Sequence, residues 1–232
     1  MNDHSDHSDT SLGATLSAIA RTLQAEPDVE STLAAIVKAA VDHVDGAEFA
    51  GISLVEHKRS IRTVAPTNPV VSAIDEVQYR VKQGPCLDAI AEREVFSTGD
   101  LATEGRWAEF ATAAAEFGVR SMLSYRLFVS DTTLGALNLY SRARDAFDRR
   151  TREDGKLFAA HAAIALVGAQ TEAQLSAAVE SRDVIGMAKG ILMERHDVDA
   201  VAAFRMLVEG SQDANMKLHQ VAAWLVEHRR GL

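Results

Sequence analysis

The stretch from Thr151 to Arg195 is the feature that most limits how this chain can fold, because it contains no proline and keeps helical spacing throughout. Its glycines are isolated, and the only kink we expect lies near Gly168. A near-continuous helix of this length is typical of a rigid connector between two domains. We place the connector itself at residues 169–178.

The residues in front of this helix alternate between helical and extended patterns. Two helical patterns precede strand-like segments such as Phe49–Val55 and Ser121–Val129. This order favours an α+β fold with an antiparallel sheet over a doubly wound βαβ fold. We place this domain at residues 12–168. In residues 1–11, Asp, His and Ser alternate without apolar periodicity, which predicts a disordered tail.

Two shorter helical patterns follow the connector, over Asp199–Glu209 and Asn215–His228. With the end of the long helix they predict an all-α, three-helix domain at residues 179–232. Its core is expected to contain Ile185, Ala188 and Leu192 from the first helix, Ala200, Ala203, Phe204, Leu207 and Val208 from the second, and Leu218, Val221, Ala222 and Leu225 from the third.

The charge of the chain argues at first against a nucleic-acid partner, because the net charge is −9. The surplus of acidic residues is unevenly distributed along the chain. Residues 176–232 contain 7 basic and 8 acidic side chains, whereas the rest of the chain contains 17 and 25. The near-neutral C-terminal region permits selective RNA binding but not strong, indiscriminate binding to any polyanion.

Several classes of protein are disfavoured by what the sequence lacks. No apolar run approaches the roughly 20 residues that a membrane-spanning helix needs. The polar, acidic N-terminus does not resemble a signal peptide. A single cysteine, Cys86, excludes an internal disulfide bond and a zinc site built on several thiolates. We therefore expect a cytoplasmic protein without a membrane segment, a metal or a cofactor.

One stripe of the long helix near its C-terminal end combines cations with a small residue. Arg182, Gly186, Lys189 and Met193 recur at helical spacing beside the expected core stripe. A phosphate backbone or a partner helix could approach such a surface closely. Spacing alone favours the helix–helix contact, with the cations solvated.

The motif around this stripe resembles a known family. Residues 182–193 (RDVIGMAKGILM), with Ala203-Phe204, Leu207, Asn215, Lys217-Leu218 and Val221-Ala222, are similar to the ANTAR family of RNA-binding antitermination modules. The resemblance implies a three-helix module that acts as a dimer. Such a dimer grips a paired stem-loop in nascent RNA and thereby excludes a competing terminator.

The resemblance also implies which residues bind RNA. Arg182 and Lys189 match charged positions of the family's first helix, and Asn215 and Lys217 match positions that open the third. The cations would meet phosphates, and Asn215 would read the edge of an unpaired base. Other roles stay open: Asn215 stands where an N-cap belongs, and Arg182 can pair with neighbouring acids. Trp224 can stack on a base, although burial against a partner subunit is favoured.

The front of the chain resembles GAF domains, of the subtype found ahead of ANTAR modules. The residues that carry this resemblance are Gln83-Gly84-Pro85-Cys86, Asp100-Leu101, Arg106-Trp107, Gly118-Val119-Arg120-Ser121, Gly135-Ala136-Leu137-Asn138-Leu139-Tyr140 and Phe147-Asp148. The resemblance implies a central antiparallel sheet with helices on one side and, in many members, a small-molecule pocket on the other. The residues that follow Asn138 and Phe147 depart from the pattern of cyclic-nucleotide-binding members, which disfavours that ligand.

Cys86 is the candidate sensor residue of this domain. It follows a turn at the start of a short helix, where the helix N-terminus would lower the pKa of a thiol. A single-thiol sensor is one interpretation, and a small buried core residue is the favoured one.

Together these features favour a dimeric regulator, not an enzyme, in which a GAF-like sensor for an unidentified small molecule controls binding to RNA stem-loops. A DNA-binding factor with a helix-turn-helix is one alternative, but the 210–214 link is not a tight recognition turn. A GAF-fold enzyme is another, yet the sequence offers no combination of nucleophile, base and orienting residue.

Overall fold

A computed structural model of the chain describes residues 6–56, 60–92 and 94–228. The chain divides into two compact units, residues 1–170 and 171–232, and the division falls inside the stretch expected to be the connector. The helix α6 (Arg149–His196) contributes residues to both units. Each unit is described by itself.

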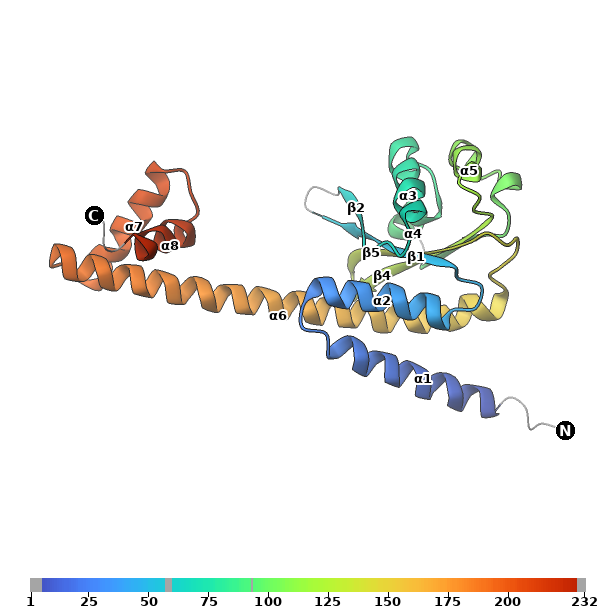
Figure 1. The fold of residues 1–232 in the computed structure, drawn as a ribbon, viewed down its shortest axis with the longest axis horizontal. Coiled ribbons are helices and arrows are strands. Elements are labelled where there is room, and N and C mark those ends of the chain that lie inside the picture. Colours follow the sequence, from blue (N-terminus) through green and yellow to red (C-terminus); the bar gives the residue numbers. More distant parts are fainter. Residues whose placement is uncertain (1–5, 57–59, 93, 229–232) are drawn as a thin grey trace. The chain divides into compact units, whose positions relative to one another are not determined.

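The first unit is built on a five-stranded antiparallel sheet (Figure 1). The strands are β1 (Phe49–Val55), β2 (Ile61–Val64), β3 (Val95–Thr98), β4 (Ser121–Val129) and β5 (Thr132–Ser141), in the order β2-β1-β5-β4-β3. The expected α+β class with an antiparallel sheet is confirmed. Because side chains alternate along a strand, each sheet face carries its own set of residues.

One face of the sheet packs against an apolar layer of helices. This layer consists of α1 (Asp6–Gln24), α2 (Val29–His43) and the first part of α6. The Asp28 carboxylate accepts a hydrogen bond from the Ser31 backbone N–H and so caps α2. Helix α1 begins inside the stretch expected to be a disordered tail. Residues 6–11 are the first turns of this helix, and residues 1–5 lie outside the described part of the chain.

The opposite face of the sheet also carries helices, which corrects the expected arrangement of helices on one side only. They are α3 (Pro69–Val81), α4 (Pro85–Ala91), the short 3₁₀ turn η2 (Leu101–Thr103) and α5 (Ala108–Ala115). The sequence interpretation missed α3 altogether. Its start signal is nevertheless present, since the Asn68 side chain accepts from the Val70 N–H and Pro69 takes the first helical position.

The second unit is a three-helix module made by the end of α6, α7 (Ala200–Asp213) and α8 (Leu218–Glu227). The fully buried core residues are Ala188, Leu192, Ala203, Leu207, Ala222 and Leu225, all of which were expected from helical spacing. The expectation that Phe204 is buried is wrong, because its side chain is 42% exposed. Within the described residues, no helix is long and apolar enough to cross a membrane.

Candidate functional site

Two of the predicted RNA-binding cations lie on α6. Arg182 is exposed, and Lys189 is partly buried because its ammonium lies 6.0 Å from the centre of the Phe204 ring. Neither forms an ion pair with another described residue. The exposed ring of Phe204 thus steadies the Lys189 side chain without neutralising its charge.

Asn215 lies in the link between α7 and α8, and its backbone explains part of its identity. Its φ of +51° is in the left-handed region, which Asn tolerates better than most residues. Its N–H donates to the Gln212 carbonyl, and the Met216 N–H donates to that of Ser211, so this link closes the end of α7. The expectation that Asn215 is an N-cap is wrong, because Lys217 holds the N-cap position of α8. The Asn215 side chain is exposed.

Lys217 is exposed at the start of α8. The Gln220 side-chain oxygen accepts from the Lys217 backbone N–H at 3.2 Å, which fixes the backbone while the ammonium stays without an ion pair among the described residues. The four predicted residues therefore form two pairs, one along α6 and one at the α7–α8 link, and all belong to the second unit.

The first unit contains a second candidate site that sequence reasoning did not find. A continuous network of buried or largely buried polar side chains lies between the sheet and helices α3 and α4. Its members are Ser53, Thr63, Asp75, Gln78, Tyr79, Cys86, Ser124, Asn138 and Tyr140. The members on strands occupy the alternate positions that face away from α2 and α6, and the other members lie on α3 and α4. Every buried polar side-chain atom of the described residues has a hydrogen-bond partner.

Asp75 is the centre of this polar network. Its carboxylate accepts hydrogen bonds from Thr63 (2.8 Å), Gln78 (2.9 Å), Tyr140 (2.5 Å) and, at 3.4 Å, Asn138. Complete burial raises the pKa of Asp75 from 3.8 to about 6, against the lowering effect of these four donors. No described cation forms an ion pair with it.

Cys86 belongs to the same network. Its thiol is fully buried and donates to the Ser53 hydroxyl at 3.1 Å, while its backbone N–H donates to Gln78. Burial, with a further contribution from the negative charge of Asp75, raises the pKa of the thiol to about 12. This direction is opposite to the effect expected of a helix N-terminus, and it supports the buried core residue over the reactive sensor.

Family models match both parts of the chain. The GAF domain model matches residues 26–167, and the ANTAR domain model matches residues 173–226. The chain belongs to the GAF domain family and carries an ANTAR domain behind its GAF domain. The ANTAR match contains Arg182, Lys189, Asn215 and Lys217, and the GAF match contains the whole polar network.

Solved structures agree with this GAF fold. The GAF domain of an Acinetobacter phosphoenolpyruvate-protein phosphotransferase is 12% identical, with a TM-score of 0.54 over 71% of this chain and 98% of that one. The free methionine-R-sulfoxide reductase of Neisseria meningitidis is 16% identical, with a TM-score of 0.55 over 69% and 91%. At these identities the likeness concerns the fold alone. No curated protein matches the chain.

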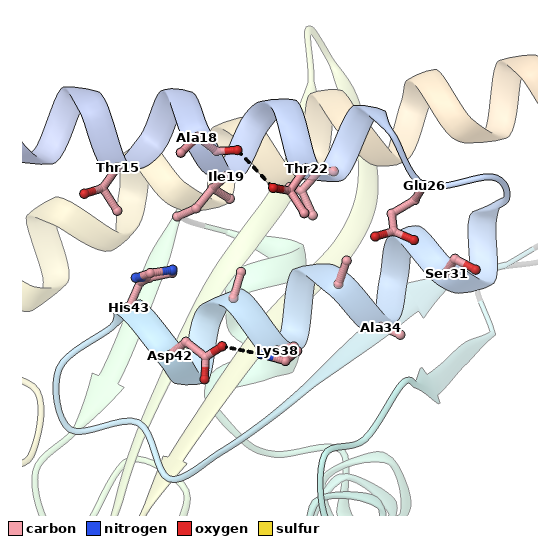
Figure 2. A pocket seen from close by; sticks show the side chains of 13 residues that line it. Thr15, Ala18, Ile19, Thr22, Glu26, Ser31, Ala34, Lys38, Asp42 and His43 are labelled. Atoms are coloured by element: carbon pink, nitrogen blue, oxygen red, sulfur yellow. Dashed lines mark hydrogen bonds and ion pairs between the residues drawn. The ribbon is translucent and has the colours of Figure 1, made fainter.

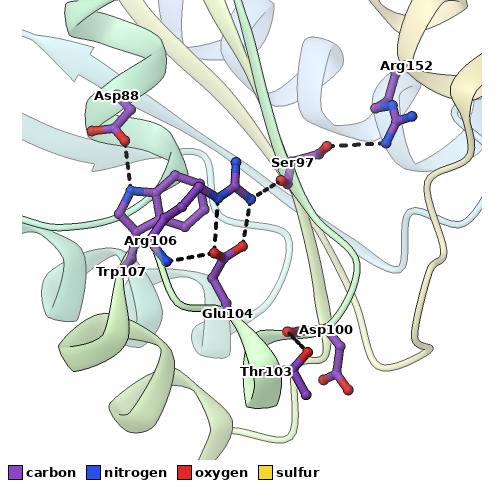
Figure 3. A network of polar contacts seen from close by, with 8 residues as sticks. All are labelled: Asp88, Ser97, Asp100, Thr103, Glu104, Arg106, Trp107 and Arg152. Atoms are coloured by element: carbon purple, nitrogen blue, oxygen red, sulfur yellow. Dashed lines mark hydrogen bonds and ion pairs between the residues drawn. The ribbon is translucent and has the colours of Figure 1, made fainter.

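The GAF signature residues Arg106 and Trp107 hold a loop in place (Figure 3). Arg106 bonds both carboxylate oxygens of Glu104, donates to the Ser97 carbonyl at 2.7 Å and lies 4.2 Å from the Trp107 ring centre. The indole N–H of Trp107 donates to Asp88 on α4 at 2.7 Å. Because these groups satisfy one another, this cluster ties β3 and α4 to the loop between η2 and α5 and offers no free group to a ligand.

A groove of about 770 Å³ lies between α1 and α2 of the GAF domain (Figure 2). Small residues such as Ala18, Thr22 and Ala34 line much of it. Its Lys38 and Asp42 pair with each other at 2.6 Å. Because it lacks buried polar groups that converge on its interior, it is a weak candidate for ligand recognition.

Proposed function

We propose that this GAF–ANTAR chain is a transcription antitermination regulator, in which a dimer of ANTAR domains binds paired stem-loops in nascent RNA. The observation that carries the proposal is the ANTAR match over residues 173–226, which contains the RDVIGMAKGILM motif and both pairs of candidate contact residues. The exposure of Arg182 and Lys217 and the absence of ion pairs at the cations, within the described residues, support it.

The roles of the contact residues follow from their chemistry. Lys189, Arg182 and Lys217 would meet phosphate oxygens as unpaired cations. The exposed amide of Asn215 has both a donor and an acceptor for the edge of an unpaired base. With so few cations, binding would depend on salt only moderately, and recognition would rest on the shape of the hairpin.

We further propose that α6 forms the dimer contact. Its exposed apolar side chains include Leu157, Ile164, Leu175 and Val179. Their spacings of 7, 11 and 4 residues are close to whole helical turns, so they recur on one side of a helix, as in a coiled-coil seam. Sedimentation equilibrium of the full chain tests this: the mass of two chains supports the contact, and the mass of one chain contradicts it.

The GAF domain would control RNA binding by the ANTAR domain. No small-molecule site is assigned to the GAF domain, because the buried polar side chains on the α3 side of the sheet satisfy one another and the α2 and α6 side is apolar. A ligand changes RNA binding only if it binds two arrangements of the protein with different affinity.

RNA binding is tested with purified full-length protein and an RNA of two stem-loops. Lys189→Ala should weaken binding and reduce the slope of log affinity against log salt by about 0.7 to 0.9, the effect of one lost phosphate contact. Lys156→Ala removes the same charge from the GAF domain, where Lys156 pairs with Glu153, and serves as the matched control.

Two outcomes would contradict the proposal. Equal binding of the stem-loops and of duplex DNA of the same sequence would favour a DNA-binding factor. Unchanged affinity and salt slope in Lys189→Ala would remove Lys189 from the contact surface.

A further inference from the structure

Helix α8 exposes a stripe of side chains whose chemistry differs from the rest of the ANTAR surface. Lys217, Gln220, Trp224 and His228 are exposed and follow one another at spacings of 3, 4 and 4 residues, so they share one face of the helix. Trp224 is 45% exposed, although a residue of this size gains most from burial. Packing in the core of the ANTAR domain therefore does not explain why a tryptophan stands at this position.

The Trp224 ring has an aromatic partner on the same helix. It stacks on the His228 imidazole, with the ring centres 4.7 Å apart and the planes 21° from parallel. Nδ1 of His228 lies 2.8 Å from the Trp224 carbonyl oxygen. A carbonyl can only accept, so Nδ1 carries a hydrogen and donates it, and this bond fixes the imidazole against the indole. The two rings form a preformed flat platform whose outer surface faces solvent.

The surroundings of this platform do not fit a protein interface. The exposed neighbours of Trp224 on α8 are Gln220, Glu227 and His228, all polar, whereas the centre of a protein interface is apolar. The stripe itself carries one lysine, Lys217, at its N-terminal end and no carboxylate.

We propose that the Trp224–His228 pair is a stacking platform for an unpaired base of the bound RNA, with Gln220 and Lys217 beside it as hydrogen-bond partners for that nucleotide. The inference rests on the proposed function and extends it, since it assigns loop-base recognition to α8 and not only to Asn215. Stacking on an aromatic side chain tolerates any base, so the platform would fix the position of the loop and leave its sequence to polar contacts.

The first test uses the unmodified protein. The chain has two tryptophans, and Trp107 is only 3% exposed, so acrylamide quenching reports mainly on Trp224. A two-stem-loop RNA should protect Trp224 from acrylamide. The same RNA with abasic loop positions should bind more weakly and leave Trp224 accessible.

The second test removes the platform. Trp224→Ala should weaken binding of the intact RNA about tenfold, as expected for one lost base stack, and should not weaken binding of the abasic RNA further. Trp224→Phe should retain most of the affinity. Val201→Ala is the matched control, because Val201 is another exposed apolar residue of the same domain.

The outcomes separate this inference from the function on which it rests. If the intact RNA binds wild type and Trp224→Ala equally and does not protect Trp224, the platform is wrong while RNA binding stands. If Trp224→Ala instead converts a dimer into monomers, Trp224 is a subunit contact and the platform is again wrong. If the wild-type protein binds no stem-loop RNA, both proposals fail.

Discussion

The GAF interior and the ANTAR surface place polar chemistry in opposite ways. In the GAF domain the polar side chains beneath α3 are buried, and each is satisfied by a neighbour. In the ANTAR domain the candidate residues lie at the surface, with Lys189 partly buried, and the candidate cations Arg182, Lys189 and Lys217 form no ion pair with another described residue. A satisfied buried network makes one structure specific, whereas unsatisfied surface groups are available to a partner. The difference makes the ANTAR surface, and not the GAF interior, the better candidate for contact with a partner.

The largest expected effect is the unfolding of the ANTAR domain while the GAF domain stays folded. Leu192→Asp places a carboxylate in a core of six buried apolar side chains. We expect residues 171–228 to lose amide protection in hydrogen exchange while the GAF domain keeps its own unfolding transition. Met193→Asp is the control, because the neighbouring Met193 is 37% exposed. An intact Leu192→Asp module would show that the core face of α6 is assigned incorrectly.

A smaller effect concerns how the GAF domain depends on pH. Below pH 3.8 Asp75 is protonated in both the folded and the unfolded chain. Between pH 3.8 and about 6 the unfolded chain releases this proton first, so the Asp75 contribution to stability falls as pH rises, by roughly 3 kcal/mol in all. Asp100 and Glu104 act in the opposite direction at lower pH, because their arginine partners lower both pKa values to about 2.

Asp75→Asn isolates the Asp75 contribution. An amide oxygen can still accept from Gln78 and Tyr140, and the amide nitrogen can donate to the Thr63 hydroxyl. Urea unfolding of this variant should lose the fall in stability between pH 4 and 6, and Asp131→Asn in the exposed β4–β5 turn should keep it. The same slope in wild type and Asp75→Asn would mean that Asp75 does not titrate in the folded domain.

The smallest effect concerns the reactivity of the Cys86 thiol and leaves the stability of the GAF domain unchanged. A buried thiol with a raised pKa should react with an aromatic disulfide reagent only when the GAF domain unfolds. Ser176→Cys, on an exposed turn of α6, should react at once and calibrates the reagent. Equally fast labelling of Cys86 would restore it as a candidate sensor thiol.

The fold was predicted well where local signals are strong. The strands Phe49–Val55 and Ser121–Val129 match their expected bounds. Helix α3 was missed, although Asn68-Pro69 is a start signal, because Asp75, Gln78 and Tyr79 interrupt its apolar pattern. The residues that disguised α3 are the ones that form the polar network.

The sequence by itself determined the two domain classes, the long helix between them and the motif that marks the ANTAR domain, because these depend on periodicity and on residues close together in the chain. Only the tertiary structure decided which polar residues meet. Asp75 and Tyr140 are 65 positions apart, and their contact depends on how α3 packs over β5. It also decided that Asn215 closes α7, because that role depends on a left-handed backbone and not on its place before a helix. Local patterns specify elements, whereas burial and pairing are properties of the assembled chain.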